Sequence, residues 1–438
     1  MRAIIMAGGK GTRIAAMEAS VPKPMIRLCG KPVLEYQLEW LKSQGIEEAV
    51  LVIGHLGHVI KEYFGSGSNI SPVTGESFGM RLRYLEEREP LGTAGALYYL
   101  REELKEDFLL MNGDVMVDID LRRFLDAHQR YGGLVTILTH PNSHPYDSGI
   151  VETDGNGMVT GWLSREDKRG WYQNRVNAGL HLMNPGIFDY AREMGLFREP
   201  KRVDLDRDIL KLMIAGGRLF AYDSPEYVKD MGTPKRCRMV EKDIEQGRVH
   251  ARNLSRPQKA VFLDRDGTIN ESRGYIRTPE ELVLLPGAGD AIRRLNESGY
   301  LVIVVTNQPV IARGEVTEEE LRTIHNRMET LLGNQGAYVD AIYYCPHHPD
   351  RGYPGERPEL KKMCRCRKPE PGMLLKAAKD YHIELKASWM AGDGPADMEA
   401  GRAAGCRTAG VAGCHGDDMT CADLAEFVRR LCGTEQSV

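Results

Sequence analysis

The sequence predicts two α/β domains in series, because the chain twice runs from a short apolar strand into a turn suited to phosphate. The first strand covers residues 2–7 and is followed by glycines; the second covers residues 260–263 and is followed by aspartates. Strand and helix patterns alternate, which indicates largely parallel sheets with ligand sites at the carboxyl ends of strands. At 438 residues the chain is too long for one ordinary core.

The composition is that of an ordinary globular protein, with 42% hydrophobic and 27% charged residues and a net charge of -4. This balance gives no indication of a nucleic-acid or membrane surface. The sequence shows no signal peptide and no apolar run of membrane-spanning length, so we expect a cytoplasmic protein. Nine cysteines, with Cys364 and Cys366 one residue apart, favour reduced thiols and metal over disulfides. Composition leaves a homo-oligomer open.

A glycine-rich turn follows the first strand, and small residues in such a turn let backbone amides approach an anion. Lys23 stands between two prolines, on stiff extended backbone that suits a fixed cation, although an ordinary exposed lysine fits the spacing too. A second small-residue turn at residues 91–96 suits contact with a base or sugar. The expected nucleotide-binding residues of the two turns are Gly8, Gly9, Gly11, Thr12, Gly92 and Thr93.

Further strands and a helix follow in this half. Pro32 opens a helix with apolar residues at helical spacing, and residues 49–53 form the next strand. Residues 108–111 form a buried strand that ends in Asn112-Gly113-Asp114. Because magnesium prefers oxygen ligands, Asp114 is the predicted magnesium ligand.

These motifs, with Asn177-Ala178-Gly179 and Asp230-Met231-Gly232-Thr233-Pro234, resemble those of sugar-1-phosphate nucleotidyltransferases over about residues 1–245. The resemblance implies a Rossmann-like domain in which a sugar 1-phosphate attacks a nucleoside triphosphate and expels pyrophosphate. It assigns phosphate contacts to Arg13 and Lys23, Mg²⁺ to Asp114 and Asp230, and sugar contacts to Glu152 and Asn177. Alignment and charge neutralisation suffice for such a displacement.

One position departs from this family. Where the family often has Glu-Lys, this chain has Ser164-Arg165. Arg165 can replace the lysine as a sugar-site cation, but Ser164 cannot replace a carboxylate. Nearby Trp162 is interpreted as a core-packing residue.

A polar, basic and aperiodic stretch separates the two domain signatures. We therefore expect a nucleotidyltransferase domain at 1–247, a linker at 248–258 and a second domain at 259–438. Basic residues in the linker could guide anionic intermediates between sites, although a solvated linker is the favoured interpretation.

Asp264 and Asp266 follow the second apolar strand, where alternation sends both carboxylates to one side. Taken alone, Asp-x-Asp-Gly fits an ordinary strand-to-turn junction equally well. Later motifs supply more polar groups: Thr306 and Asn307 follow strand 301–305, Arg367 and Lys368 follow a loop, and Asp393 and Asp397 follow strand 389–391.

In this order the motifs resemble haloacid dehalogenase-type phosphatases over about residues 259–415. The resemblance implies that Asp264 attacks phosphorus and that Asp266 acts as general acid and base. It places Mg²⁺ on Asp264, Asp393 and the backbone carbonyl of Asp266, and the phosphoryl group on Thr306 and Lys368. Asp397 would orient Lys368 or the metal shell.

Two paired spacings predict a metal centre. Cys345, His347, Cys364 and Cys366 supply three sulfurs and one nitrogen, a set that closes a structural tetrahedral zinc site. His348 is the alternative to His347, and unrelated free thiols are the alternative to a metal site.

This zinc loop resembles that of D-glycero-D-manno-heptose 1,7-bisphosphate phosphatases and their relatives, the histidinol phosphatases. Pro309-Val310 replace the Ser-Gly common there, which puts substrate fit in question. The two resemblances together imply dephosphorylation of a heptose bisphosphate, then transfer of GMP from GTP to heptose 1-phosphate. The expected product is GDP-D-glycero-α-D-manno-heptose for surface polysaccharide. Alternatives are a hexose-1-phosphate nucleotidyltransferase joined to a histidinol-phosphate-type phosphatase, and a catalytically silent regulatory half.

Overall fold

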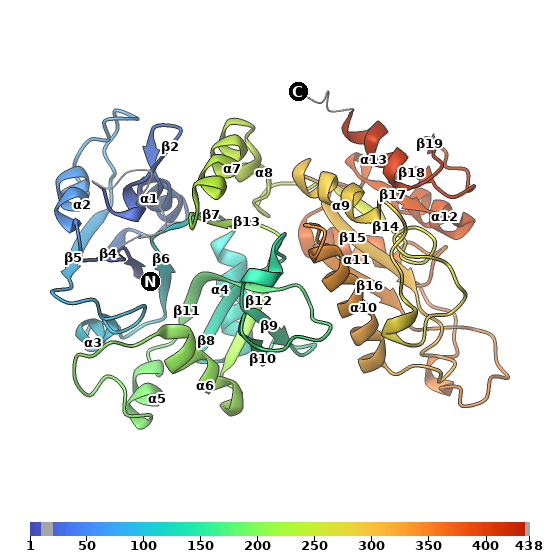
Figure 1. Ribbon diagram of the computed structural model, residues 1–438, viewed down its shortest axis with the longest axis horizontal. Helices are drawn as coiled ribbons and strands as arrows, with labels where there is room; N and C mark the ends of the chain where they lie inside the picture. The colour runs from blue at the N-terminus through green and yellow to red at the C-terminus, as the bar shows by residue number, and fades with distance from the viewer. Residues whose placement is uncertain (10–20, 434–438) are drawn as a thin grey trace. The chain divides into compact units, whose positions relative to one another are not determined.

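The computed structural model describes residues 1–9 and 21–433 and divides into two compact units (Figure 1). The first unit holds Met1–His140, Val151–Trp162 and Asn177–Asn253. The second holds Pro141–Ile150, Leu163–Val176 and the chain from Leu254 onward. Two segments from the first half of the sequence therefore belong to the second unit. The boundaries expected at residues 247 and 259 stay a prediction.

A mixed sheet forms the centre of the first unit and, within the described residues, has nine strands. Its path is β10-β9-β11-β6-β1-β4-β5, with β8 pairing to β11 and β12. The strands β1, β4, β5 and β6 are parallel to their neighbours in this group, whereas β11 is antiparallel to β6. The bounds are β1 Ala3–Met6, β4 Glu48–Ile53, β5 Arg81–Glu86, β6 Phe108–Asn112, β8 Val135–His140, β9 Ile150–Thr153, β10 Val159–Leu163, β11 Val176–Met183 and β12 Leu219–Asp223.

Helices cover both faces of this sheet, and strand alternation explains why two cores form. Ile5 lies in one apolar cluster and Ile4 in the other, since successive strand residues point to opposite faces. The predicted parallel strands and the helix after Pro32 are confirmed. The helices are α1 Val33–Ser43, α2 Gly57–Phe64, α3 Leu97–Leu100, α4 Leu121–Tyr131, α5 Ile187–Glu193, α6 Lys211–Met213, α7 Pro234–Glu245 and α8 Arg248–Ala251, with the π-helix η3 at Leu205–Leu210.

A small antiparallel ribbon joins β7 (Val115–Asp118) to β13 (Tyr227–Asp230) in the first unit. Short hairpin strands β2 (Arg27–Leu28) and β3 (Lys31–Pro32) lie apart from the main sheet. Asp118 at the end of β7 accepts hydrogen bonds from His250 and from Asn253, the latter at 2.6 Å. Helix α8, at the start of the stretch expected to be a linker, is thereby fixed to β7.

The second unit has a parallel six-stranded sheet in its described part, in the order β16-β15-β14-β17-β18-β19. The bounds are β14 Ala260–Leu263, β15 Leu301–Asn307, β16 Ala341–Cys345, β17 Trp389–Gly392, β18 Arg407–Gly410 and β19 Met419–Thr420. Its helices are α9 Ala288–Glu297, α10 Glu318–Gly333, α11 Gly372–Tyr381, α12 Pro395–Ala404 and α13 Leu424–Cys432. The predicted strands around residues 260, 301 and 389 are confirmed. No helix among the described residues is long and apolar enough to cross a membrane.

A buried polar network holds the segment Leu163–Val176 against helix α10 within the second unit. Arg175 lies 3.3 Å from the carboxylate of Glu329, and both side chains are almost fully buried. Glu329 also accepts the backbone N–H of Asn174 at 2.8 Å. Because a buried charge is costly without a partner, each group of this network depends on the others.

Candidate active sites and metal centre

The first candidate site joins two aspartates at neighbouring strand ends, Asp114 after β6 and Asp230 at the end of β13. The backbone N–H of Met231 donates to the carbonyl of Asp114 at 2.8 Å, which holds the two strand ends together. Each carboxylate contacts a cation: Asp114 pairs with Lys23, and Asp230 accepts from Arg236 at 2.8 and 2.9 Å. The predicted metal ligands and the predicted phosphate-binding lysine therefore meet in one place.

Gly113 explains how Asp114 reaches this position. Its N–H donates to the carbonyl of Met6 at 3.0 Å, and a Cβ on Gly113 would lie 2.9 Å from that oxygen. A larger residue would push the turn after β6 away from β1. The glycine thus keeps Asp114 beside the end of the first strand.

Two residues expected at the sugar, Glu152 and Asn177, lie on β9 and β11 of the first unit, whereas the third, Arg165, lies in segment Leu163–Val176 of the second unit. Asn177 accepts the N–H of Gly179 at 3.1 Å and donates to Asp206 at 3.3 Å. A Cβ on Gly161 would lie 2.4 Å from the Glu152 carboxylate, so glycine leaves room for that side chain. Arg165 is exposed and lies 3.6 Å from Glu166.

Next to the nucleotide turns lies the carboxylate of Glu87, which the sequence did not single out. Gly8 packs closely against β4 and Glu87, because a Cβ there would lie 2.9 Å from a Glu87 oxygen. Burial raises the pKa of Glu87, an effect that the N–H of Leu91 opposes. In the second turn Gly92 has φ +82°, and Thr93 accepts the N–H of Leu205 at 2.7 Å. Gly9 is exposed, while the predicted Gly11, Thr12 and Arg13 lie outside the described residues.

The second candidate site is centred on Asp264, directly after β14. The ammonium of Lys368 lies 2.6 Å from Asp264, 2.6 Å from Asp397 and 2.8 Å from the carbonyl of Val305. Burial raises the pKa of Asp264, which Lys368 opposes. Burial lowers the pKa of Lys368, but the two carboxylates outweigh it and the net shift is upward. The positively charged form of Lys368 is therefore stabilised, and it lies beside an Asp264 carboxylate that is shielded from water.

Asp266 is held by donors on three sides. It accepts hydrogen bonds from the fully buried Arg265 at 2.8 to 3.0 Å, from Asn270 at 2.9 Å and from Gln308 at 3.0 Å. Gln308 also donates to Thr306 at 2.8 Å, so the general-acid candidate and the phosphate-binding candidate share a partner. These contacts fix the position of the Asp266 carboxylate beside the end of β14.

Three carboxylates of this site can hold a cation together. Oxygens of Asp264, Asp393 and Asp397 lie within 4.8 Å of one another. Gly267, at φ +84°, makes this approach feasible, since a Cβ there would lie 2.0 Å from Asp393. Oxygen donors at such spacing suit a hard divalent cation.

Asn307 and Arg367, the remaining predicted phosphate-binding residues, make contacts within the loops around Lys368. Asn307 exchanges two hydrogen bonds of 3.0 Å with the backbone of Lys368. Arg367 donates to the carbonyl of His347 at 3.3 Å, which joins the active-site loop to the neighbouring cysteine loop.

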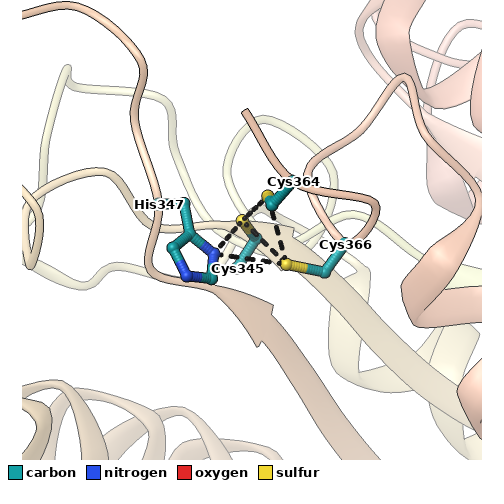
Figure 2. Close-up of side chains that lie close together, drawn as sticks. All are labelled: Cys345, His347, Cys364 and Cys366. Carbon is teal, nitrogen blue, oxygen red and sulfur yellow. Dashed lines mark hydrogen bonds between the residues drawn. The ribbon is translucent and has the colours of Figure 1, made fainter. Parts of the chain in front are cut away.

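Cys345, His347, Cys364 and Cys366 converge as one cluster (Figure 2). The sulfur atoms lie 3.3 to 3.5 Å from one another, and the Nδ1 atom of His347 lies 3.4 and 3.6 Å from the sulfurs of Cys366 and Cys345. Tetrahedral zinc, with bonds of about 2.3 Å to sulfur, needs ligand atoms just under about 4 Å apart. His348 is directed elsewhere, and its ring packs edge-on against Tyr353. The four side chains therefore fit a closed, four-ligand metal centre that includes His347.

Comparison with known proteins assigns each half. The nucleotidyl transferase family model matches residues 2–247, and the haloacid dehalogenase-like hydrolase model matches residues 214–405. The D-glycero-beta-D-manno-heptose-1,7-bisphosphate 7-phosphatase of Salmonella typhi is 43% identical over 155 residues, which cover 35% of this chain and 80% of that protein. The chain belongs to both families. The corresponding phosphatase of Yersinia pestis is 44% identical over 149 residues, 34% of this chain and 77% of that protein.

Two solved structures resemble the two halves. HddC from Yersinia pseudotuberculosis is 21% identical with a TM-score of 0.46, and the match covers 56% of this chain and 99% of HddC. The D,D-heptose 1.7-bisphosphate phosphatase from B. bronchiseptica is 35% identical with a TM-score of 0.35. The match covers 40% of this chain and 98% of that phosphatase. The family matches and the curated relatives show that this chain carries a nucleotidyltransferase and a phosphatase, as the sequence predicted.

Proposed function

We propose that the chain makes a nucleotide-activated heptose in two steps. The second half removes the 7-phosphate of D-glycero-D-manno-heptose 1,7-bisphosphate, and the first half transfers GMP from GTP to the heptose 1-phosphate, releasing pyrophosphate. The observation that carries this proposal is a lysine–aspartate pair at a strand end in each unit, Lys23 with Asp114 and Lys368 with Asp264. Curated relatives of the second half act, by name, on that bisphosphate.

The phosphatase step begins with attack of an Asp264 oxygen on phosphorus, which gives an aspartyl phosphate and expels the sugar alkoxide. Asp266 gives the alkoxide a proton and later takes one from the water that hydrolyses the intermediate. Lys368, 2.6 Å from Asp264, holds the transferring phosphoryl oxygens as the nucleophile's negative charge is lost. Mg²⁺ bound by Asp264 and Asp393 would neutralise charge so that a carboxylate can approach a phosphate.

The nucleotidyl transfer needs no protein nucleophile, since the phosphate of the sugar 1-phosphate attacks the α-phosphorus itself. Lys23 would bind the reacting phosphates, with Arg13 at the leaving pyrophosphate. Asp114 and Asp230 would hold Mg²⁺, which supplies further charge neutralisation. Glu152 and Asn177 are the proposed sugar contacts.

Glu87 supports guanine as the base. Its half-buried carboxylate faces the Gly8 turn, and the N–H of Leu91 lies 3.3 Å from one of its oxygens. Guanine presents two adjacent N–H donors, N1–H and the N2 amino group, which a carboxylate accepts together, whereas uracil presents a single N–H. Replacing Glu87 with Gln should therefore reduce the preference for GTP over UTP.

The Cys345, His347, Cys364 and Cys366 cluster is proposed to hold structural zinc. All four positions of a tetrahedral ion would be filled by protein atoms, which leaves no place for a reacting water. Burial raises the pKa of the Cys345 thiol, so a bound cation would be needed to keep it a thiolate.

The test is a mass spectrum of products after incubation with the heptose 1,7-bisphosphate, GTP and Mg²⁺. Because the relatives' names specify the β-anomer, both anomers should be supplied in separate reactions. GDP-heptose with phosphate and pyrophosphate would support both steps. Heptose 1-phosphate without a nucleotide sugar would refute GTP as donor and direct the work to UTP and ATP. No release of phosphate from either anomer, with release from histidinol phosphate, would refute the proposed phosphatase substrate.

A further inference from the structure

Asp206 lies beside the proposed sugar contacts of the first unit and has no part in the chemistry described above. Asp204, Asp206 and Asp208 alternate with other residues at the start of η3. The outer two bind backbone N–H groups and Arg207 of the same segment. Asp204 accepts the N–H of Arg207 at 2.9 Å, as the residue that caps η3. Asp208 accepts the N–H of Asp204 at 2.8 Å and also pairs with Arg207 at 2.8 Å.

Asp206 instead turns toward Asn177, whose amide nitrogen donates to its carboxylate at 3.3 Å. The hydroxyl oxygen of Thr93, in the second nucleotide turn, accepts the N–H of Leu205 at 2.7 Å and fixes the start of η3. Asn177 is itself held by the N–H of Gly179. The Asp206 carboxylate is thus fixed between the turn at residues 91–96 and strand β11, where the sugar contacts are proposed.

Among the residues that the structure describes, one side-chain hydrogen bond reaches the Asp206 carboxylate, the 3.3 Å contact from Asn177. Burial, reinforced by the neighbouring charge of Asp204, raises the pKa of Asp206 to about 6. Lys211 and the long hydrogen bond from Asn177 act in the opposite direction but do not outweigh burial. Even so the residue is not fully enclosed, since part of its surface stays accessible. A desolvated carboxylate with one weak donor gains from any ligand that brings hydroxyl groups.

We propose that Asp206 accepts hydrogen bonds from ring or side-chain hydroxyls of the sugar 1-phosphate and so selects the sugar. The inference rests on the proposed nucleotidyl transfer and adds a sugar-selecting residue to Glu152 and Asn177. Vicinal hydroxyls fit the two oxygens of a carboxylate. In this proposal Asp206 contacts the sugar and leaves the nucleotide to other residues.

The decisive variant is Asp206→Asn, which keeps the shape of the side chain and an oxygen that can accept from Asn177. We expect the KM for heptose 1-phosphate to rise about 10- to 100-fold, the loss expected for hydrogen bonds to a charged group. The KM for GTP and the phosphatase activity should not change. Asp204→Asn is the matched control, because asparagine also caps helices and the change in charge is the same.

A set of monodeoxy sugar 1-phosphates separates contact from support. If Asp206 binds a hydroxyl, the substrate that lacks this hydroxyl will have a lower kcat/KM than the complete sugar with the native enzyme. With Asp206→Asn the two substrates will have nearly the same kcat/KM. Equal losses in both enzymes for every deoxy substrate, or an unchanged KM in Asp206→Asn, would overturn the inference alone. A native enzyme that forms no nucleotide sugar would overturn it together with the proposed function.

Discussion

The two lysine–aspartate pairs differ most in burial. In the first unit the side chains of Lys23 and Asp114 are 15% and 29% exposed, whereas Lys368 and Asp264 are 3% and 13% exposed. Lys368 also contacts a second carboxylate, that of Asp397, and a backbone carbonyl. The first pair is thus more open to solvent, and the second is more enclosed and makes more contacts.

This difference follows from what each carboxylate is proposed to do. Asp114 would hold a cation while substrate atoms react, so its charge must stay available to an incoming metal and phosphate. Asp264 would form the bond to phosphorus itself, and a nucleophile gains from a fixed position and from the loss of bound water. The comparison teaches that similar residue pairs can serve different chemistry when burial separates them.

Asp264→Asn should have the largest effect. Because the amide cannot form the aspartyl phosphate, phosphate release should fall on the order of 10⁴-fold or more. Nucleotidyl transfer from supplied heptose 1-phosphate should be unchanged. Phosphate release and nucleotide-sugar formation would be measured separately, with Asp290→Asn, at an exposed position of α9, as the control. Undiminished phosphate release would refute Asp264 as nucleophile.

Asp114→Asn tests the open pair. Loss of a charged metal ligand should lower nucleotidyl transfer on the order of 10²- to 10³-fold, a smaller effect because Asp230 and Lys23 remain. Phosphatase activity on the bisphosphate should be retained. Asp126→Asn, on the exposed side of α4, controls for the change in charge. Parallel loss of both activities would contradict independent sites.

Metal removal should distinguish the two units by stability. The native protein should contain one tightly bound zinc, and Cys364→Ser should lose it, whereas Cys414→Ser should not. Because binding of a structural metal contributes directly to folding, the loss should lower the free energy of unfolding of the second unit by several kcal/mol. Metal analysis and thermal unfolding, followed by residual nucleotidyl transfer, would measure this. Zinc retained in Cys364→Ser would exclude the proposed ligand set.

The Lys368→Met and Lys23→Met variants compare the pairs directly. Removing Lys368 leaves two buried carboxylates without their cation, which should cost about 3 kcal/mol of unfolding free energy as well as activity. Removing Lys23 should cost less than about 1 kcal/mol, since water reaches its partner. Urea unfolding of both variants would show the difference. Equal losses of stability would mean that burial does not separate the two pairs.

The sequence predicted much of this arrangement because strand ends are local features. Asp114 and Asp264 directly follow apolar strands, so their place at the edge of a sheet could be inferred without tertiary information. The proposed zinc ligands could be paired from spacing, although only the structure separates His347 from His348. In each case a local pattern carried the inference.

Other residues could not be found in this way. Glu87 stands among charged neighbours and Asp206 among alternating aspartates, patterns that usually indicate a solvated surface. Their burial arises from distant contacts, with the Gly8 turn and with Asn177. The attachment of segment Leu163–Val176 to α10 likewise depends on Arg175 meeting Glu329 far along the chain. Hydrophobic periodicity carries no information about contacts between residues that are distant in the sequence.

A predicted effect of pH on stability should be common to both units. His181 in β11 is buried, and burial lowers its pKa to about 4, against the opposing hydrogen bond involving Leu110. Burial also lowers the pKa of His325 in α10. In an unfolded chain a histidine titrates near about 6.5. Between these values only the unfolded chain takes up the proton, so stability is complete above pH of about 6.5 and falls as the pH decreases.

For His181 alone, moving from pH 7.5 to 5.0 should lower the free energy of unfolding by about 2 kcal/mol. His181→Gln should flatten that dependence in the first unit, because glutamine does not titrate. His58→Gln, at an exposed position of α2, should leave the slope unchanged. Urea unfolding at both pH values would measure the slopes. If His181→Gln kept the native slope, His181 would not be the source of the acid sensitivity of the first unit, and the proton uptake on unfolding would have to be assigned to another group with a lowered pKa, such as His128.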